Sequence, residues 1–143
     1  MTTSSNPTQI KRVLFICSAN SVRSQMAEGF LRQLYPEKYD GYSAGIQSSY
    51  VHPKAHRTMA EIGIDLTHHT SNAVDEYLKD DFDVAIILCE HASKVCPPIP
   101  NTKEVLHWPT PDPTNFPGPL SEAENYMRNI RDGLGQKIKN HFK

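Results

Sequence analysis

The stretch Arg12-Val13-Leu14-Phe15-Ile16-Cys17-Ser18-Ala19-Asn20-Ser21-Val22-Arg23-Ser24 decides the fold of this chain. Its apolar first part is typical of a buried strand, and a helical pattern begins near Ser24. A strand, a short polar loop and a helix in this order place the backbone N–H groups of the loop at a helix N-terminus, where they bind anions. Asn20 suits such a loop because asparagine tolerates a left-handed backbone.

A cysteine and an arginine stand at the two ends of this loop. The helix dipole, the loop amides, the Ser24 hydroxyl and the charge of Arg23 all favour the thiolate form of Cys17. The same cradle fits a tetrahedral oxyanion, which Arg23 can hold in bidentate fashion. The pattern therefore predicts a nucleophilic sulfur facing a phosphate-like group, bound by Ser18, Ala19, Asn20, Ser21, Val22, Arg23 and Ser24. The alternative is that Cys17 only ends a buried strand, since free cysteines are often buried.

Strand and helix signals alternate along the chain. Strands are predicted over residues 10–17, 41–44, 82–88 and 104–108. Helices are predicted over 25–35, from Pro53 to before Gly63, over 72–78, and after a capping box formed by Ser121 and Glu124. This order predicts an α/β three-layer sandwich with a four-stranded parallel sheet and right-handed crossovers. We expect residues 1–9 to be a disordered lead-in and residues 10–143 to be one domain.

Three residues far apart in the sequence follow the ends of predicted strands. Cys17 ends the first strand, Cys89 ends the third, and Asp112 follows the fourth. Ligands of parallel sheets bind beyond the carboxyl ends of the strands. We therefore expect these side chains to converge on one rim of the sheet.

Cys89 and Cys96 are separated by seven positions. On a continuous helix they would lie about 10 Å apart, beyond the limit of about 7 Å between the Cα atoms of a disulfide. The segment between them would have to loop or unwind before they could bond, and Pro97 and Pro98 close it. The alternative is that both thiols are incidental.

The composition narrows the choice of partners and compartment. Fifteen basic and sixteen acidic side chains give a net charge of −1, and no dense basic stretch is present, so we expect neither DNA nor RNA as a partner. The N-terminal residues have no signal-peptide pattern, and the longest apolar run, 84–89, is far too short for a membrane span. Three cysteines suit a reducing compartment, so we expect a cytoplasmic protein with no membrane partner. No histidine spacing matches a zinc site, and we interpret the histidines as surface or structural residues, with neither a metal nor a cofactor required.

Taken together, these motifs resemble the low-molecular-weight tyrosine phosphatase superfamily, which has a flavodoxin-like topology. Within it the chain is most similar to the thiol-dependent arsenate reductases that are coupled to thioredoxin. The resemblance covers nearly the whole chain: Cys17–Arg23 with the following residues 24–29, Ser43–Ile46, Pro53–Ala55, His69–Ser71, the segment from Cys89 to Cys96, His107-Trp108 and Asp112-Pro113.

The resemblance implies a relay of three thiols. Cys17 would attack arsenate, while Asp112 would protonate the leaving oxygen. Cys89 would then attack Cys17 and release arsenite, and Cys96 would attack Cys89 and move the disulfide outward. Thioredoxin or another thiol reductant would regenerate the enzyme, and phosphate or sulfate would compete with arsenate.

Two departures and two alternatives accompany this reading. Many relatives carry a further cysteine at the position of Val22, and some carry an aspartate at the position of Asn72, beside a potassium site that matches Asn20, Glu28 and Ser43. Loss of that carboxylate puts the potassium site in doubt.

A phosphatase would use Cys17, Arg23 and Asp112 to hydrolyse phosphomonoesters through a phospho-cysteine, as the main or as a side activity. A third alternative is a non-catalytic protein that binds an oxyanion or senses redox state.

Overall fold

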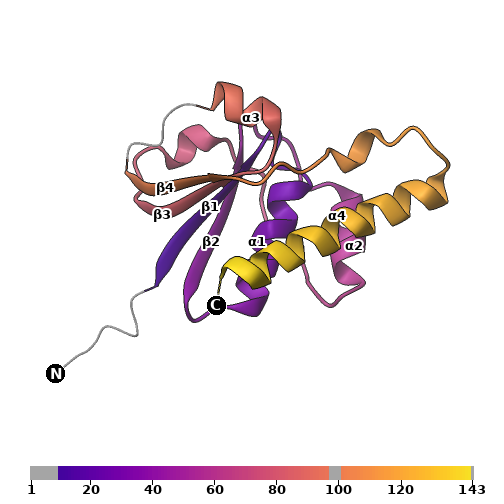
Figure 1. Cartoon of the computed structure of the whole chain (residues 1–143), viewed down its shortest axis with the longest axis horizontal. Coiled ribbons are helices and arrows are strands. Elements are labelled where there is room, and N and C mark those ends of the chain that lie inside the picture. Colours follow the sequence, from indigo (N-terminus) through magenta and orange to yellow (C-terminus); the bar gives the residue numbers. More distant parts are fainter. Residues whose placement is uncertain (1–9, 97–100, 143) are drawn as a thin grey trace.

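The computed structural model describes residues 10–96 and 101–142. The expected lead-in over residues 1–9 and the two prolines at 97 and 98 lie outside the described residues. The elements, drawn in Figure 1, are β1 (Lys11–Cys17), α1 (Arg23–Leu34), β2 (Tyr39–Gly45), α2 (Pro53–Ala60), the 3₁₀ helix η2 (Val74–Tyr77), β3 (Phe82–Ile87), α3 (Glu90–Val95), β4 (Thr102–His107), the 3₁₀ helix η3 (Pro113–Asn115) and α4 (Leu120–His141).

The four strands form one parallel sheet in the order β2-β1-β3-β4. The two central strands, β1 and β3, are those with the strongest apolar runs, as expected for strands that are covered on both faces. Their register pairs Ile16 with Ile87, and Cys17 pairs with Gly45 on the other side. The carboxyl ends of β1, β2 and β3 therefore meet at one rim, and the predicted parallel sheet is confirmed.

Helices cover both faces of the sheet, which confirms the predicted three layers. Phe15 of β1 contacts Phe142, just beyond α4, with ring centroids 6.4 Å apart. Tyr42 of β2 points to the opposite face and contacts Tyr77 of η2 at 5.9 Å. Figure 1 shows α1, α2 and α4 packed together on the first face, with α3 and η2 on the second.

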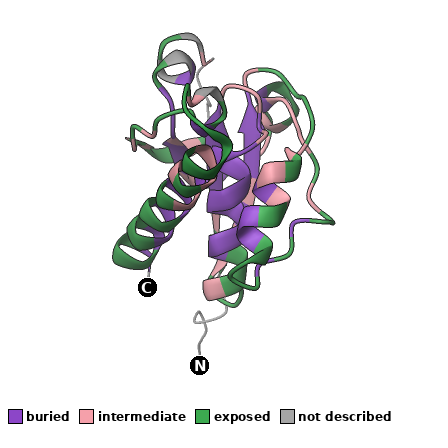
Figure 2. Cartoon of the chain, turned by 90° about the vertical axis from the view of Figure 1, so that its right-hand side faces the viewer, coloured by how far each residue is buried: buried purple, intermediate pink, exposed green. Residues whose placement is uncertain are grey.

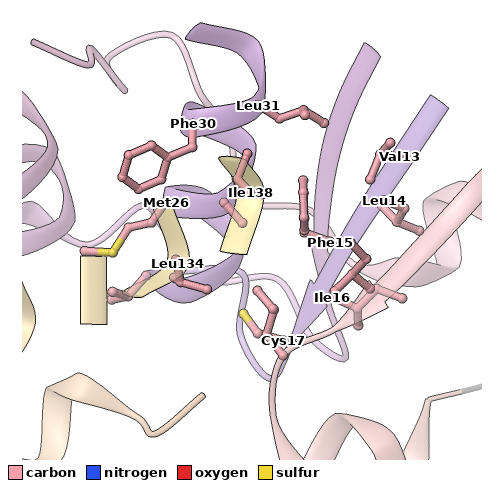
Figure 3. Close-up of a cluster of buried hydrophobic side chains, with 14 of the residues drawn as sticks. Val13, Leu14, Phe15, Ile16, Cys17, Met26, Phe30, Leu31, Leu134 and Ile138 are labelled. Atoms are coloured by element: carbon pink, nitrogen blue, oxygen red, sulfur yellow. The ribbon is translucent and has the colours of Figure 1, made fainter. Parts of the chain in front are cut away.

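The core lies between the sheet and α1 and α4. Figure 2 shows buried residues concentrated in the strands and on the inner faces of these helices, and Figure 3 shows Met26 and Leu31 of α1 with Leu134 and Ile138 of α4 in one cluster with β1. Each such side chain contributes roughly 1.5–3 kcal/mol when fully buried. The end of β1 that carries Cys17 is therefore held by the packed core.

Two predicted helix starts need correction. Helix α1 begins at Arg23, so Arg23 and Ser24 belong to its first turn. The capping box predicted from Ser121 and Glu124 is wrong. Helix α4 begins at Leu120, directly after Pro119, without a side-chain cap. Pro119 has the fixed φ of proline and an extended ψ of 158°, and its carbonyl accepts the first helical hydrogen bond from Ala123.

None of the described helices is long and apolar enough to span a lipid bilayer.

Candidate active site

The loop between β1 and α1 is held in shape by its own backbone and by β2. Asn20 has φ of 51°, the left-handed conformation expected of it. The carbonyls of Cys17 and Ser18 accept hydrogen bonds, both of 3.1 Å, from the amides of residues 46 and 47 that follow β2. A Cβ atom added to Gly45 would lie 2.6 Å from the Asn20 nitrogen, so only glycine allows this approach.

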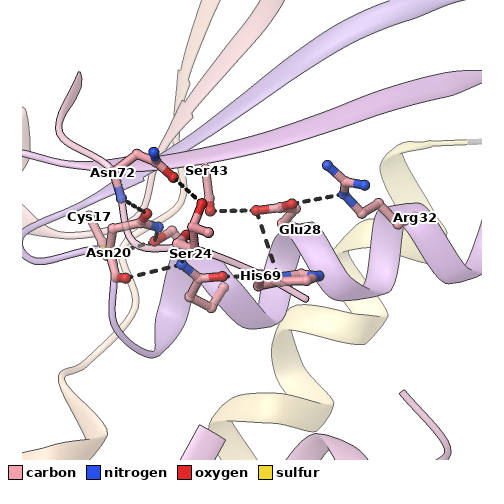
Figure 4. Close-up of polar contacts among 10 residues, drawn as sticks. Cys17, Asn20, Ser24, Glu28, Arg32, Ser43, His69 and Asn72 are labelled. Carbon is pink, nitrogen blue, oxygen red and sulfur yellow. Dashed lines mark hydrogen bonds and ion pairs between the residues drawn. The ribbon is translucent and has the colours of Figure 1, made fainter. Parts of the chain in front are cut away.

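Cys17 lies at the end of a chain of buried hydrogen bonds (Figure 4). Asn20 Nδ2 donates to Ser24 Oγ at 2.8 Å, and Ser24 Oγ is 2.9 Å from Cys17 Sγ. When Cys17 is a thiolate the sulfur can only accept, so the Ser24 hydroxyl then donates to it. Asn20 and Ser24 are fully buried and Cys17 is 2% exposed. The arrangement is suited to stabilising a negative charge on Cys17.

A second layer of hydrogen bonds supports the loop from the segment before η2. Gln25 Nε2 donates to the backbone carbonyls of Asn20 and Thr70. The backbone N–H of Asn72 donates to Asn20 Oδ1 at 2.8 Å. Since the amide nitrogen of Gln25 is engaged, Gln25 Oε1 accepts from His69 Nδ1 at 2.9 Å. Burial, followed by the charge of Arg32, lowers the pKa of His69 to about 4. His69 is therefore a neutral donor that helps to fix the loop.

Glu28 is buried below the loop, with Ser43, Arg32 and His69 around its carboxylate (Figure 4). Ser43 Oγ donates to Oε1 at 2.5 Å, and Arg32 Nε lies 2.7 Å from Oε2. Burial raises the pKa of Glu28 and outweighs the opposing effects of Ser43 and Arg32. Across the described part of the chain, no cluster of three or more histidine, cysteine or carboxylate side chains could hold a metal ion. A potassium ion does not fit these residues well, because Arg32 already balances the one carboxylate.

A cavity of about 240 Å³ opens above Cys17. Its lining comes from the loop, from the segment after β2 and from the segment after β4: Cys17, Ser18, Ala19, Ser21, Val22, Arg23, Ser49, Tyr50, His52, Asp112 and Thr114.

Arg23 and Asp112 are brought to this cavity from different elements. Arg23 Nη1 donates to the carbonyl of Thr110 at 2.9 Å, which ties the segment after β4 to the first turn of α1. Thr110 in turn donates from its hydroxyl to the carbonyl of Trp108. Burial opposes ionisation of Asp112, but hydrogen bonds from Thr114 and the charge of Arg23 outweigh it and hold the pKa of this carboxyl below its ordinary value.

Cys89 and Cys96 stand at the two ends of α3. Cys89 Sγ is 3.2 Å from Ser18 Oγ and accepts a hydrogen bond from the Ala92 amide at 3.4 Å, which makes it the N-cap of the helix. Cys96 is the C-cap residue. Burial, followed by the charge of Asp75, raises the pKa of Cys96. None of the three cysteines forms a disulfide in this structure.

The structure brings Cys17, Arg23 and Asp112 to one cavity. Cys89 does not line it but contacts the hydroxyl of Ser18, which does. Of the predicted anion-binding residues, Asn20 and Ser24 lie beneath the loop as supports and do not line the cavity. Sequence reasoning missed Tyr50 and His52: His52 was considered only as a zinc ligand or as a surface or structural residue, and Tyr50 was not considered. The position of His52 directly before Pro53, in the connection that leaves the carboxyl end of β2, is the signal that could have found it.

Fold and site together define a class of protein. It is an α/β protein in which a cysteine and an arginine stand at the two ends of an amide-rich loop between the first strand and the first helix. The sequence profile of the family described as low molecular weight phosphotyrosine protein phosphatase matches residues 12–143. The chain belongs to this family, and it is an enzyme.

The most informative relatives share one name. The chain is 42% identical to an arsenate reductase of Halalkalibacterium halodurans over 129 residues, which is 90% of this chain and 93% of the relative. It is 39% identical to an arsenate reductase 2 of Staphylococcus saprophyticus, over 92% of this chain and 96% of the relative. A solved arsenate reductase in a phosphate-binding state is 34% identical and superposes with a TM-score of 0.78, covering 92% of this chain and 95% of its own.

Proposed function

We propose that this enzyme reduces arsenate to arsenite through a relay of Cys17, Cys89 and Cys96. The observation that carries the proposal is the position of Cys89 beside the Cys17 loop, at the start of a short helix that ends at Cys96. Cys17 lies in the loop, Cys89 is linked to that loop by Ser18, and Cys96 lies at the far end of a six-residue helix. The names of the relatives support arsenate as the substrate.

The first step forms a bond between the Cys17 sulfur and arsenic. The loop amides and Arg23 hold the oxyanion, the thiolate attacks, and one arsenic oxygen leaves as water after Asp112 has supplied a proton. Asp112 is ionised in the empty site, but the negative charge of a bound oxyanion raises the pKa of a neighbouring carboxyl. Substrate binding thus favours the protonated form that the step needs.

The second step transfers two electrons to arsenic. Cys89 attacks the Cys17 sulfur, the sulfur–arsenic bond breaks, and its electron pair stays on arsenic, which leaves as arsenite. The products are arsenite and a Cys17–Cys89 disulfide. The amide of Ala92, which points at the Cys89 sulfur, favours the thiolate needed for this attack.

The third step returns Cys17 to the thiolate. Cys96 attacks Cys89, and the resulting Cys89–Cys96 disulfide is reduced by an external dithiol such as thioredoxin. A straight helix would separate residues 89 and 96 by about 10 Å. Formation of the first disulfide withdraws the Cys89 sulfur from the Ala92 amide, and a helix of six residues is unstable without tertiary or capping contacts. Unwinding of α3 would then deliver Cys96.

The Cys89→Ser variant tests the relay against the phosphatase alternative. We expect arsenate reduction, measured as NADPH oxidation coupled through thioredoxin reductase and thioredoxin, to fall to background, while hydrolysis of para-nitrophenyl phosphate is retained. Cys17→Ser should abolish both activities. Undiminished arsenate reduction by Cys89→Ser would defeat the proposal.

The Cys96→Ser variant isolates the intermediate. One equivalent of arsenate should release one equivalent of arsenite and leave a Cys17–Cys89 disulfide, identified by peptide mapping without reduction. Only free thiols after exposure to arsenate would contradict the order of steps.

A further inference from the structure

His52 lies in the wall of the cavity above Cys17, and the thiol relay makes no use of it. It lines the same cavity as Arg23 and Asp112. Its backbone amide donates to the carbonyl of Ser21 in the loop at 3.1 Å. The Tyr50 ring stacks on its imidazole, with centroids 6.0 Å apart and planes inclined by 22°. The imidazole is therefore tied to the loop and held on one face by an aromatic ring.

The hydrogen bonding of His52 fixes its tautomer. The Lys54 amide donates to Nδ1 at 3.1 Å, so the neutral ring carries its proton on Nε2. Burial, followed by the charges of Lys54 and Arg57, lowers the pKa of His52 and outweighs the opposing effect of Asp112. Near neutral pH the wall of the cavity therefore presents an uncharged N–H donor.

His52 lines the cavity, where an oxyanion oxygen could accept a hydrogen bond from its Nε2–H group. In the proposed function the loop amides and Arg23 would hold the oxygens of a tetrahedral oxyanion nearest Cys17, and Asp112 would face the leaving oxygen. We propose that His52 is a substrate-binding residue, whose Nε2–H donates a hydrogen bond to an outward oxygen of the bound oxyanion. The proposal rests on the proposed function for the identity of the anion, but the contact itself would hold any tetrahedral oxyanion.

Sulfate is a suitable test ligand because it keeps its charge of −2 between pH 5 and pH 8. Its binding is measured as protection of Cys17 from iodoacetamide, followed by peptide mapping. In His52→Asn, a side-chain oxygen can still accept from the Lys54 amide, but the ring donor is gone. We expect the concentration of sulfate for half-protection to rise about tenfold at pH 7. His56→Asn, the same exchange one helical turn onward and outside the cavity, should leave it unchanged within about twofold.

Two further readouts separate a binding role from a structural one. His52→Asp also keeps a helix cap but adds a negative charge, so it should weaken sulfate protection more than His52→Asn does. As the pH falls below the ordinary pKa range of histidine, protonation of the wild-type ring should tighten sulfate binding more than in His52→Asn, because the lowered pKa of His52 shifts this change to the acid side. The other charged or titratable groups near His52 are Asp112, Lys54 and Arg57, which act on its charge, and Cys17 and Arg23, which line the same cavity; both proteins share all five.

Equal protection of wild type and His52→Asn, with parallel pH profiles, would overturn the proposal. So would equal weakening in His52→Asn and His52→Asp. Sulfate protection needs no arsenate turnover. A protein that fails to reduce arsenate but shows the His52-dependent difference would refute the proposed function alone.

Discussion

Removal of the Ser24 hydroxyl should make Cys17 a weaker nucleophile at low pH. In the folded protein Ser24 Oγ is 2.9 Å from Cys17 Sγ, and its hydroxyl donates to the sulfur whenever Cys17 is a thiolate, which can only accept. A hydrogen bond to a charged group contributes about 1.5–3 kcal/mol. Since 1.4 kcal/mol corresponds to a factor of ten, the Ser24→Ala variant should hold roughly 10- to 100-fold less Cys17 thiolate wherever the thiol is mostly protonated.

The assay is the rate of iodoacetamide alkylation of Cys17 between pH 5.5 and pH 9, followed by peptide mapping so that each cysteine is counted separately. The rate of Ser24→Ala should be several-fold below wild type at the acid end, because the smaller thiolate population is partly offset by the greater nucleophilicity of a more basic thiolate. The difference between the two proteins should shrink as the pH rises, if the hydroxyl acts on the charge of the sulfur.

Ser18→Ala is the matched control, because the Ser18 hydroxyl contacts Cys89 and not the nucleophile. It should change alkylation of Cys89 while leaving that of Cys17 within about twofold. If the ratio of wild type to Ser24→Ala is the same at every pH, Ser24 affects access to the sulfur and not its charge, and the reasoning is refuted.

Three further outcomes follow from contacts described above. Burial lowers the pKa of His69 from 6.5 to about 4, so the unfolded chain binds more protons in that window and the free energy of unfolding falls as the pH drops through it. In urea titrations the wild type should lose more of its free energy of unfolding between pH 6.5 and pH 4 than His69→Gln does. Asp112→Asn should lower kcat for arsenate reduction at least about 100-fold without weakening sulfate protection of Cys17. Gly45→Ala should cost about 3 kcal/mol or more, measured by denaturation, because its Cβ meets backbone atoms of Asn20 and Gln47 closer than 3 Å.

Each of these three predictions can be contradicted by a specific result. Parallel pH dependence of unfolding in wild type and His69→Gln would mean that another group titrates in this window. A small effect of Asp112→Asn on kcat would remove that carboxyl from the proton transfer. A stable Gly45→Ala would show that the loop can move away from β2.

Local sequence signals were sufficient for the sheet and for the loop. The apolar runs of β1 and β3, the polar loop after Cys17 and the tolerance of Asn20 for a left-handed backbone are properties of adjacent residues. The carboxyl-end rule then brought Cys17, Cys89 and Asp112 to one rim without any knowledge of distances.

The remaining features depend on contacts between distant segments. Helix α1 begins without a capping side chain, and α4 begins at a backbone angle set by Pro119, so neither start carried the usual sequence signal. The place of His52 in the cavity depends on the path of the connection after β2. The role of Cys89 as a helix cap depends on where β3 ends relative to α3.

The hydrogen bond from Arg23 to Thr110 connects the cavity to the only tryptophan of the chain, whose fluorescence can be measured. The chain contains one tryptophan, and Trp108 is bound through its carbonyl to the same threonine, while its indole packs edge-on against His141 and Phe142. An anion that draws the guanidinium inward will strain this short connection and alter the surroundings of the indole. Its ultraviolet emission should therefore register occupancy of the cavity without any attached dye.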